Sequence, residues 1–226
     1  MIPIWLDVSG KNLLVIGLGA VGQRRALLFQ RAGATVIGVD PLPRIQGPEW
    51  GELIRNGLEL QSVPYDITIF DELARLKIRP VLVLACATAE VNRRIIADCR
   101  QLGLLVASAT TDTDEPADFQ LGALARGDYL QVSVQSGQAS PGLSAAVRDE
   151  IAESLLPAAD RLAEVAKAWR PRILSEVADP VLKKQLLELF ADRSILQMEM
   201  AQAGSGVEKL QKLLQCVMFL LYLTLC

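Results

Sequence analysis

Short, uncharged apolar runs alternate with longer amphipathic segments in the first half of the chain. The apolar runs cover residues 12–16, 34–39, 81–88 and 104–109. Runs of this length are typical of parallel strands that are covered on both faces. The segments that follow Gly19, Asp66 and Glu90 have the apolar spacing of helices. This alternation predicts an α/β fold with a Rossmann-type parallel sheet.

The pattern changes beyond residue 118. Residues 119–125 and 129–135 alternate apolar and polar side chains on either side of Arg126-Gly127-Asp128, which predicts an antiparallel hairpin. A hairpin outside the α/β alternation has exposed edges. We therefore expect it to be part of a dimerisation region.

The rest of the chain is predominantly helical. Proline at positions 157, 171 and 180 predicts helix breaks there. Together these patterns predict three parts: a Rossmann domain at residues 1–112, a small β dimerisation region at 113–145 and a helical C-terminal domain at 146–226.

A glycine turn lies between the first apolar run and the first helix. Gly17 permits a tight turn out of the strand, Gly19 lets the backbone approach a pyrophosphate, and Gly22 lets the helix pack closely on the sheet. The phosphates of a dinucleotide would bind the free amides at the start of this helix, which includes Ala20 and Val21.

An acidic residue ends the second apolar run. Asp40 lies about 20 residues beyond the glycines, where a carboxylate can accept hydrogen bonds from both ribose hydroxyls. Because a carboxylate there repels a 2′-phosphate, the sequence favours NAD over NADP. The alternative is another doubly wound domain in which Asp40 is a surface turn residue before Pro41.

The third apolar run ends in Ala87-Thr88, and the next helix carries Asn92. Ligands of open α/β sheets bind at the carboxyl ends of the strands, so we expect Thr88 and Asn92 to face the cofactor. An ordinary turn at the end of a core strand is the alternative.

The composition of the chain excludes several kinds of binding and catalysis. A net charge of −3 argues against broad nucleic-acid binding, and the complete lack of histidine excludes Ser-His and Cys-His catalysis. The four cysteines have no metal-ligand spacing, so no protein metal site is expected. The N-terminus does not have the pattern of a signal peptide, and the apolar run 216–226 is shorter than a membrane span; a cytoplasmic protein is expected and a membrane location is not.

Several motifs occur together in an order that resembles the precorrin-2 dehydrogenase and sirohydrochlorin ferrochelatase family, the N-terminal module of siroheme synthase. The resemblance covers roughly residues 1–157. It is carried by the lead-in 2–11, the glycine turn with Arg24-Arg25, the segment 85–88 with Asn92, and the loop 132–141.

The resemblance implies an enzyme that oxidises precorrin-2 to sirohydrochlorin with NAD during siroheme biosynthesis. It also implies a homodimer, and ferrous iron as a second substrate in those members that insert it. The catalytic aspartate of the family corresponds to Asp112, with Asp114 as a rival. Lying among like charges at a strand end, Asp112 would have a raised pKa and could serve as general base. An Asx-rich solvated turn is the alternative.

The substrate that the resemblance implies carries eight carboxylates, so a cationic cleft is expected despite the negative net charge. Ser136 and Ser140 fall in a loop where family members place a serine near the substrate, although helix capping by Ser140 explains that residue equally well. Arginine suits paired carboxylate contacts. The basic candidates are Arg148, Arg161, Lys167, Arg170 and Arg172.

Two other functions fit the same residues. A non-enzymatic, NAD-sensing dimeric regulator would keep Gly17, Gly19 and Asp40 without needing Asp112. A Rossmann oxidoreductase with a small substrate would need a narrower site without a cationic rim.

Overall fold

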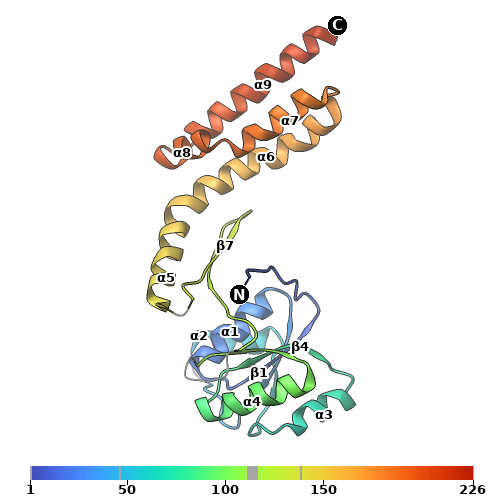
Figure 1. Cartoon of the computed structure of the whole chain (residues 1–226), viewed down its shortest axis with the longest axis vertical. Coiled ribbons are helices and arrows are strands. Elements are labelled where there is room, and N and C mark those ends of the chain that lie inside the picture. Colours follow the sequence, from blue (N-terminus) through green and yellow to red (C-terminus); the bar gives the residue numbers. More distant parts are fainter. Residues whose placement is uncertain (1, 46, 111–116, 138, 226) are drawn as a thin grey trace. The chain divides into compact units, whose positions relative to one another are not determined.

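The structure is a computed structural model that describes residues 2–45, 47–110, 117–137 and 139–225, the last six for their backbone alone. The chain divides into two compact units, Met1–Leu121 and Gly122–Cys226 (Figure 1). The first unit contains the parallel sheet, and the second contains a hairpin and a set of helices.

The sheet of the first unit has five parallel strands in the order β3-β2-β1-β4-β5. This order reverses direction at β1, which makes the carboxyl ends of β1 and β4 the switch point where ligands of such sheets bind. The strands are β1 (Asn12–Ile16), β2 (Thr35–Val39), β3 (Glu59–Gln61), β4 (Pro80–Ala85) and β5 (Leu105–Ser108). The helices between them are α1 (Ala20–Arg31), α2 (Pro48–Arg55), α3 (Thr68–Arg75) and α4 (Ala89–Leu102).

Both faces of this sheet are covered by helices (Figure 1). Because side chains alternate along a strand, β1 sends Leu13 and Val15 to the face that α1 and α2 cover. It sends Leu14 and Ile16 to the opposite face, against α3 and α4. Burial on both faces explains why β1, β2, β4 and β5 carry no charged residue, whereas the edge strand β3 begins with the exposed Glu59.

The second unit begins with an antiparallel hairpin of β6 (Ala123–Arg126) and β7 (Gln131–Val134). Its helices enclose a separate apolar core that includes Leu162, Ile173 and Leu214. They are α5 (Pro141–Glu150), α6 (Leu156–Glu176), α7 (Pro180–Glu188), α8 (Arg193–Ala201) and α9 (Ser205–Leu225), with a π-helical turn η1 (Ile151–Leu155) and a short 3₁₀ turn η2 (Leu189–Ala191).

The predicted helix breaks at Pro157 and Pro171 are wrong. The chain stays helical from α5 through η1 into α6, and α6 continues past Pro171. The wider π-helical turn ends at Leu155, two residues before Pro157, which has no backbone N–H to donate to the preceding turn. Burial of Ile173 two residues beyond Pro171 offsets the loss of one donor there. Pro180 does begin a new helix, as predicted.

The Rossmann-type sheet, the small β region and the helical C-terminal part confirm the predicted fold class. The three-part domain division stays a prediction. No helix in the described part of the chain is both long and apolar enough to cross a membrane.

Candidate functional site: a nucleotide cradle at the switch point

The glycine turn follows the first strand, as predicted, and the strand order places it at the switch point of the sheet. Gly17 has a φ of +93°, and a Cβ on it would lie 2.5 Å from the backbone of Cys86 at the end of β4. A Cβ on Gly22 would overlap the carbonyl oxygen of Gly17. Gly19, by contrast, has open space where a Cβ would stand, and it precedes the first amides of α1. The turn is therefore closely packed at Gly17 and Gly22 and open at Gly19, which suits the approach of a pyrophosphate.

Asp40 lies beside this turn. One carboxylate oxygen accepts a hydrogen bond from the backbone N–H of Leu18 at 2.6 Å, and the other accepts one from Leu42 at 2.8 Å. A carboxylate has about four acceptor sites, so both oxygens retain capacity for ribose hydroxyls. The structure thus brings the predicted ribose-binding residue and the predicted phosphate-binding turn together.

Sequence reasoning missed a third residue of this site, Gln23. Its side-chain amide donates to the carbonyl oxygens of Leu18 at 2.7 Å and of Arg44 at 2.6 Å, and only 2% of the residue is exposed. The sequence feature that could have identified Gln23 is its spacing from the apolar residues of the helix. Gln23 is three residues before Ala26 and four before Leu27, so it lies on the inward face of α1.

The end of β4 forms the other wall of the turn. Burial raises the pKa of the Cys86 thiol, and the guanidinium of Arg25, 3.9 Å from the sulfur, only partly offsets it. Thr88 caps the N-terminus of α4 and is exposed beside this wall. The thiol is therefore uncharged at neutral pH, and Thr88 is available to a ligand.

Asn92 is fully buried, and its side chain is occupied. It accepts a hydrogen bond from the N–H of Ala87 at 2.9 Å and donates to the carbonyl of Ala87 and to Oγ1 of Thr110, at 3.3 and 3.2 Å. This geometry favours the structural alternative for Asn92, which joins the ends of β4 and β5.

Asp112 and Asp114 lie outside the described residues. The residues on either side of that segment are held at β5. Thr110 receives the bond from Asn92, and Asp118 exchanges two bonds with Val106: the backbone N–H of Asp118 donates to the Val106 carbonyl, and its carboxylate accepts from the Val106 N–H, both at 2.9 Å. Sequence reasoning did not single out Asp118.

The predicted substrate residues lie in the second unit. Ser140 caps α5 by accepting a hydrogen bond from the N–H of Leu143 at 3.1 Å. Ser136 donates to the carbonyl of Ser140 at 2.9 Å and so closes the preceding loop. Arg148, in the last turn of α5, bonds the neighbouring Asp149 at 2.6 Å. The structure brings the two serines together.

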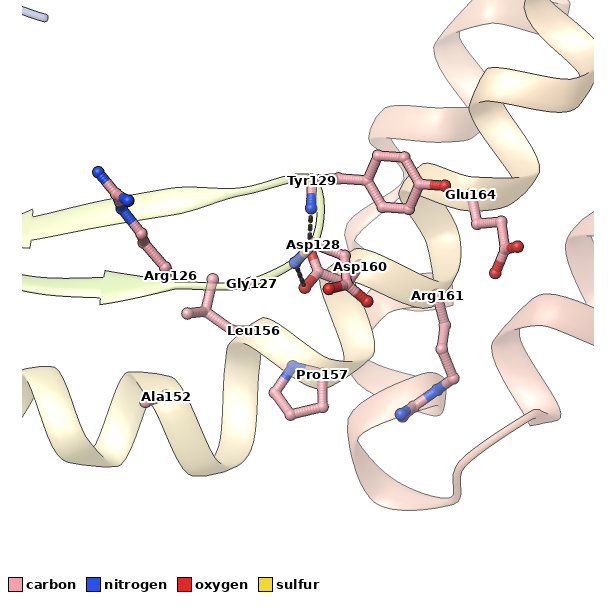
Figure 2. Close-up of a pocket in the computed structure, with 10 residues that line it drawn as sticks. All are labelled: Arg126, Gly127, Asp128, Tyr129, Ala152, Leu156, Pro157, Asp160, Arg161 and Glu164. Atoms are coloured by element: carbon pink, nitrogen blue, oxygen red, sulfur yellow. Dashed lines mark hydrogen bonds between the residues drawn. The ribbon is translucent and has the colours of Figure 1, made fainter. Parts of the chain in front are cut away.

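A cavity of about 430 Å³ lies between the hairpin turn and α6 (Figure 2). Asp160 dominates it, because its carboxylate accepts hydrogen bonds from three consecutive amides of the turn: Asp128 at 2.6 Å, and Tyr129 and Leu130 at 3.0 Å each. The absence of a side chain at Gly127 makes room for this carboxylate. Sequence reasoning missed Asp160 because its partners are about 30 residues away in the chain.

Arg161 follows Asp160 and also lines this cavity, but its guanidinium forms an ion pair with the buried Glu199. Glu199 also accepts hydrogen bonds from Gly204, Gly206 and Val207 at the start of α9. Burial raises the pKa of Glu199, yet these bonds and Arg161 outweigh it and lower the pKa overall. Arg161, one of the basic candidates for the substrate, is thus engaged in the helical core.

A strand, an open glycine turn, a helix and a carboxylate at the end of the next strand together define a dinucleotide-binding protein of the Rossmann class. The chain belongs to the family described as "Putative NAD(P)-binding", whose pattern matches residues 4–123.

Over more of its length, the chain is similar to siroheme synthases. It is 31% identical to that of Chromobacterium violaceum over 214 residues, covering 92% of this chain and 43% of the relative. It is 27% identical to that of Acinetobacter baylyi over 179 residues, covering 79% and 37%. The chain thus spans less than half the length of these curated relatives. These similarities confirm the family resemblance inferred from the sequence.

Among solved structures, the fold is similar to "SirC, precorrin-2 dehydrogenase", with a TM-score of 0.67 at 19% sequence identity. The match covers 94% of this chain and 98% of that one. It shows that the whole succession of sheet, hairpin and helices is a known fold.

Proposed function

We propose that this protein oxidises precorrin-2 to sirohydrochlorin with NAD, as a step of siroheme biosynthesis. The nucleotide cradle formed by the glycine turn and Asp40 carries this proposal, because it fits the coenzyme that such an oxidation requires. The similarity to siroheme synthases over most of the chain supports the choice of substrate. The fold shared with a precorrin-2 dehydrogenase agrees with it.

The choice of NAD rather than NADP rests on Asp40. Its carboxylate is fixed beside the turn by Leu18 and Leu42, so a 2′-phosphate on the adenosine ribose would meet a negative charge that has little freedom to move away. The two ribose hydroxyls of NAD would instead donate to it. The amides of Ala20, Val21 and Gly22 would bind the pyrophosphate, and Thr88 would border the nicotinamide half.

NAD, when bound, supplies the hydride acceptor of the reaction. In our proposal Asp112 takes up the proton that the tetrapyrrole carbon releases, with Asp114 as the rival. Two features support a role for these residues. The chain lacks histidine, and the described residues on either side, Thr110 and Asp118, lie at β5, next to the strand that borders the glycine turn.

The substrate would be bound through its carboxylates. Arg148 is a candidate because its present partner, Asp149, is adjacent in sequence and exposed, so a substrate carboxylate can replace it at little cost. Ser136 and Ser140 shape the loop before α5 and would position its backbone for the substrate.

We further propose that the protein acts as a cytoplasmic homodimer through the hairpin region, and that ferrous iron is a candidate second substrate whose insertion would use the same catalytic carboxylate.

The test is to mix the purified protein with NAD and precorrin-2 and to follow the absorbance of NADH and of sirohydrochlorin. We expect both to appear in equal amounts. If neither forms while NAD binds, the regulator becomes the better explanation. If NADH forms only with small hydroxy acids, a general Rossmann oxidoreductase is favoured.

A further inference from the structure

Gln23 connects two segments of the nucleotide site that are far apart in sequence. One hydrogen of its side-chain amide bonds the carbonyl of Leu18 in the glycine turn, and the other bonds the carbonyl of Arg44 in the loop after β2. Both distances, 2.7 and 2.6 Å, are short for neutral hydrogen bonds, and the group is buried. Removing it would leave the buried Leu18 carbonyl and the part-buried Arg44 carbonyl without this donor.

Asp40 connects the same two segments from the other side. The Leu18 N–H donates to Asp40 while the Leu18 carbonyl accepts from Gln23, so the peptide groups on both sides of Leu18 are held. Asp40 in turn bonds Leu42, and Gln23 bonds Arg44, in the same loop. Together, the four hydrogen bonds hold the glycine turn and the loop 40–44 to one another at two points.

We propose that Gln23 is a positioning residue that fixes the distance between the pyrophosphate-binding turn and the ribose-binding carboxylate, and that it thereby sets the selectivity for NAD over NADP. This inference rests on the proposed use of a nicotinamide dinucleotide. It concerns a residue outside the glycine pattern.

The physical reason is preorganisation. A dinucleotide bridges the two segments, so any freedom of the loop relative to the turn must be lost when it binds. Gln23 removes that freedom in advance, because its bonds are made within the protein. Without it, the loop is held to the turn by the Asp40 carboxylate, which is the group that must also receive the ribose.

Arg44 is a second residue of the loop 40–44 that can affect the selectivity for NAD over NADP. Its side chain is exposed, and it lies four residues beyond Asp40. Gln23 bonds its backbone and so fixes the point from which the guanidinium extends. Once that bond is lost, the Arg44 end of the loop can shift relative to the turn, so its guanidinium can approach a 2′-phosphate, and guanidinium groups bind phosphate strongly.

The chain offers a matched control on the same helix. Gln30 also donates to a backbone carbonyl of another element, that of Leu53 at 3.2 Å, and its Oε1 is buried without a hydrogen-bond partner. Gln23→Met and Gln30→Met both replace an amide by an apolar chain of similar length. Only the first removes a bond within the nucleotide site.

The experiment measures the dissociation constants of NAD and NADP for the whole purified protein by calorimetry. Hydrogen exchange of the Leu18 and Leu42 amides is measured without nucleotide. For Gln23→Met we expect NAD to bind about tenfold more weakly, NADP to change less than threefold, and both amides to exchange faster. For Gln30→Met we expect both constants and both amides to match the wild type.

Equal weakening of NAD and NADP by Gln23→Met would overturn the proposal, since it would show a general structural role. So would a change no larger than that of Gln30→Met. A wild-type protein that binds NAD but does not oxidise precorrin-2 would overturn the proposed function and leave this inference standing. Failure of the wild type to bind either nucleotide would overturn both.

Discussion

Replacing Asp160 by alanine tests whether one carboxylate holds the hairpin turn of the second unit. Asp160 lies on α6 and accepts three backbone hydrogen bonds from residues 128–130 (Figure 2). A hydrogen bond to a charged group contributes about 1.5 to 3 kcal/mol when isolated, but three bonds to one partly exposed carboxylate are not additive. We therefore expect Asp160→Ala to lower the free energy of unfolding by about 2 to 4 kcal/mol. If the unit Gly122–Cys226 unfolds as one domain, that corresponds to a fall in Tm of roughly 9 to 18 °C.

Glu164 provides the control, because it lies one helical turn further along α6, borders the same cavity and is exposed. Glu164→Ala should change the free energy of unfolding by less than about 0.5 kcal/mol. Thermal unfolding gives the size of the effect. Hydrogen exchange locates it, since the amides of Asp128, Tyr129 and Leu130 should lose protection in Asp160→Ala alone. If the two variants unfold alike, or if those amides keep their protection, the turn is held by something else.

The stabilisation by Asp160 should depend on pH. Burial raises the pKa of Asp160, but the three backbone bonds lower it overall. Since the folded pKa is then below the unfolded value of about 3.9, the stabilisation is fully present above that pH and is lost as the pH falls through the folded pKa. The difference between wild type and Asp160→Ala should therefore shrink in acid. A difference that is constant from neutral pH to pH 2 would refute the electrostatic explanation.

The remaining predictions concern the first unit. Asp112→Asn should abolish precorrin-2 oxidation and leave the Kd of NAD unchanged; if turnover persists, Asp114→Asn tests the rival. Asp40→Ala should reduce the ratio of kcat/KM for NAD to that for NADP by at least tenfold, and an unchanged ratio would show that Asp40 does not select the coenzyme. Asn92→Ala should cost about 2 to 4 kcal/mol of stability in urea unfolding, because it removes the bonds to the part-buried backbone groups of Ala87 and leaves a cavity at a fully buried position. A cost below about 0.5 kcal/mol would contradict the structural role of Asn92.

The nucleotide half of the site could be predicted from the sequence because its determinants are local. All of them lie within one short stretch: two strands and, between them, glycines at positions 17, 19 and 22. Each glycine position needs a residue without a side chain, so the residue type itself indicates the structure. The absence of charged residues from β1, β2, β4 and β5 likewise indicates burial on both faces of the sheet. These features do not depend on which distant residue is the partner.

The contacts that hold the second unit join distant residues, and patterns along the chain do not predict those. Asp160 and Glu199 resemble any other acidic residue on an amphipathic helix, yet each binds the backbone of a loop. Proline was misleading for a related reason. The expected break at Pro171 follows from the local loss of one hydrogen bond, whereas the helical core around Ile173 offsets that loss.

Asn92 shows how the two halves of the proposed active site depend on one another. Its amide group bonds both polar groups of Ala87, whose backbone nitrogen would lie 2.6 Å from a Cβ on Gly17. The same group donates to Thr110, the last described residue before the segment that carries Asp112. A single buried side chain therefore joins the wall of the nucleotide turn to the start of the proposed catalytic segment. Because an amide both donates and accepts, it can bond the N–H and the carbonyl of Ala87 and a hydroxyl at once, which neither a carboxylate nor an apolar residue could do. In the proposed mechanism, the buried asparagine would therefore act as a positioning residue that fixes where the segment with Asp112 begins.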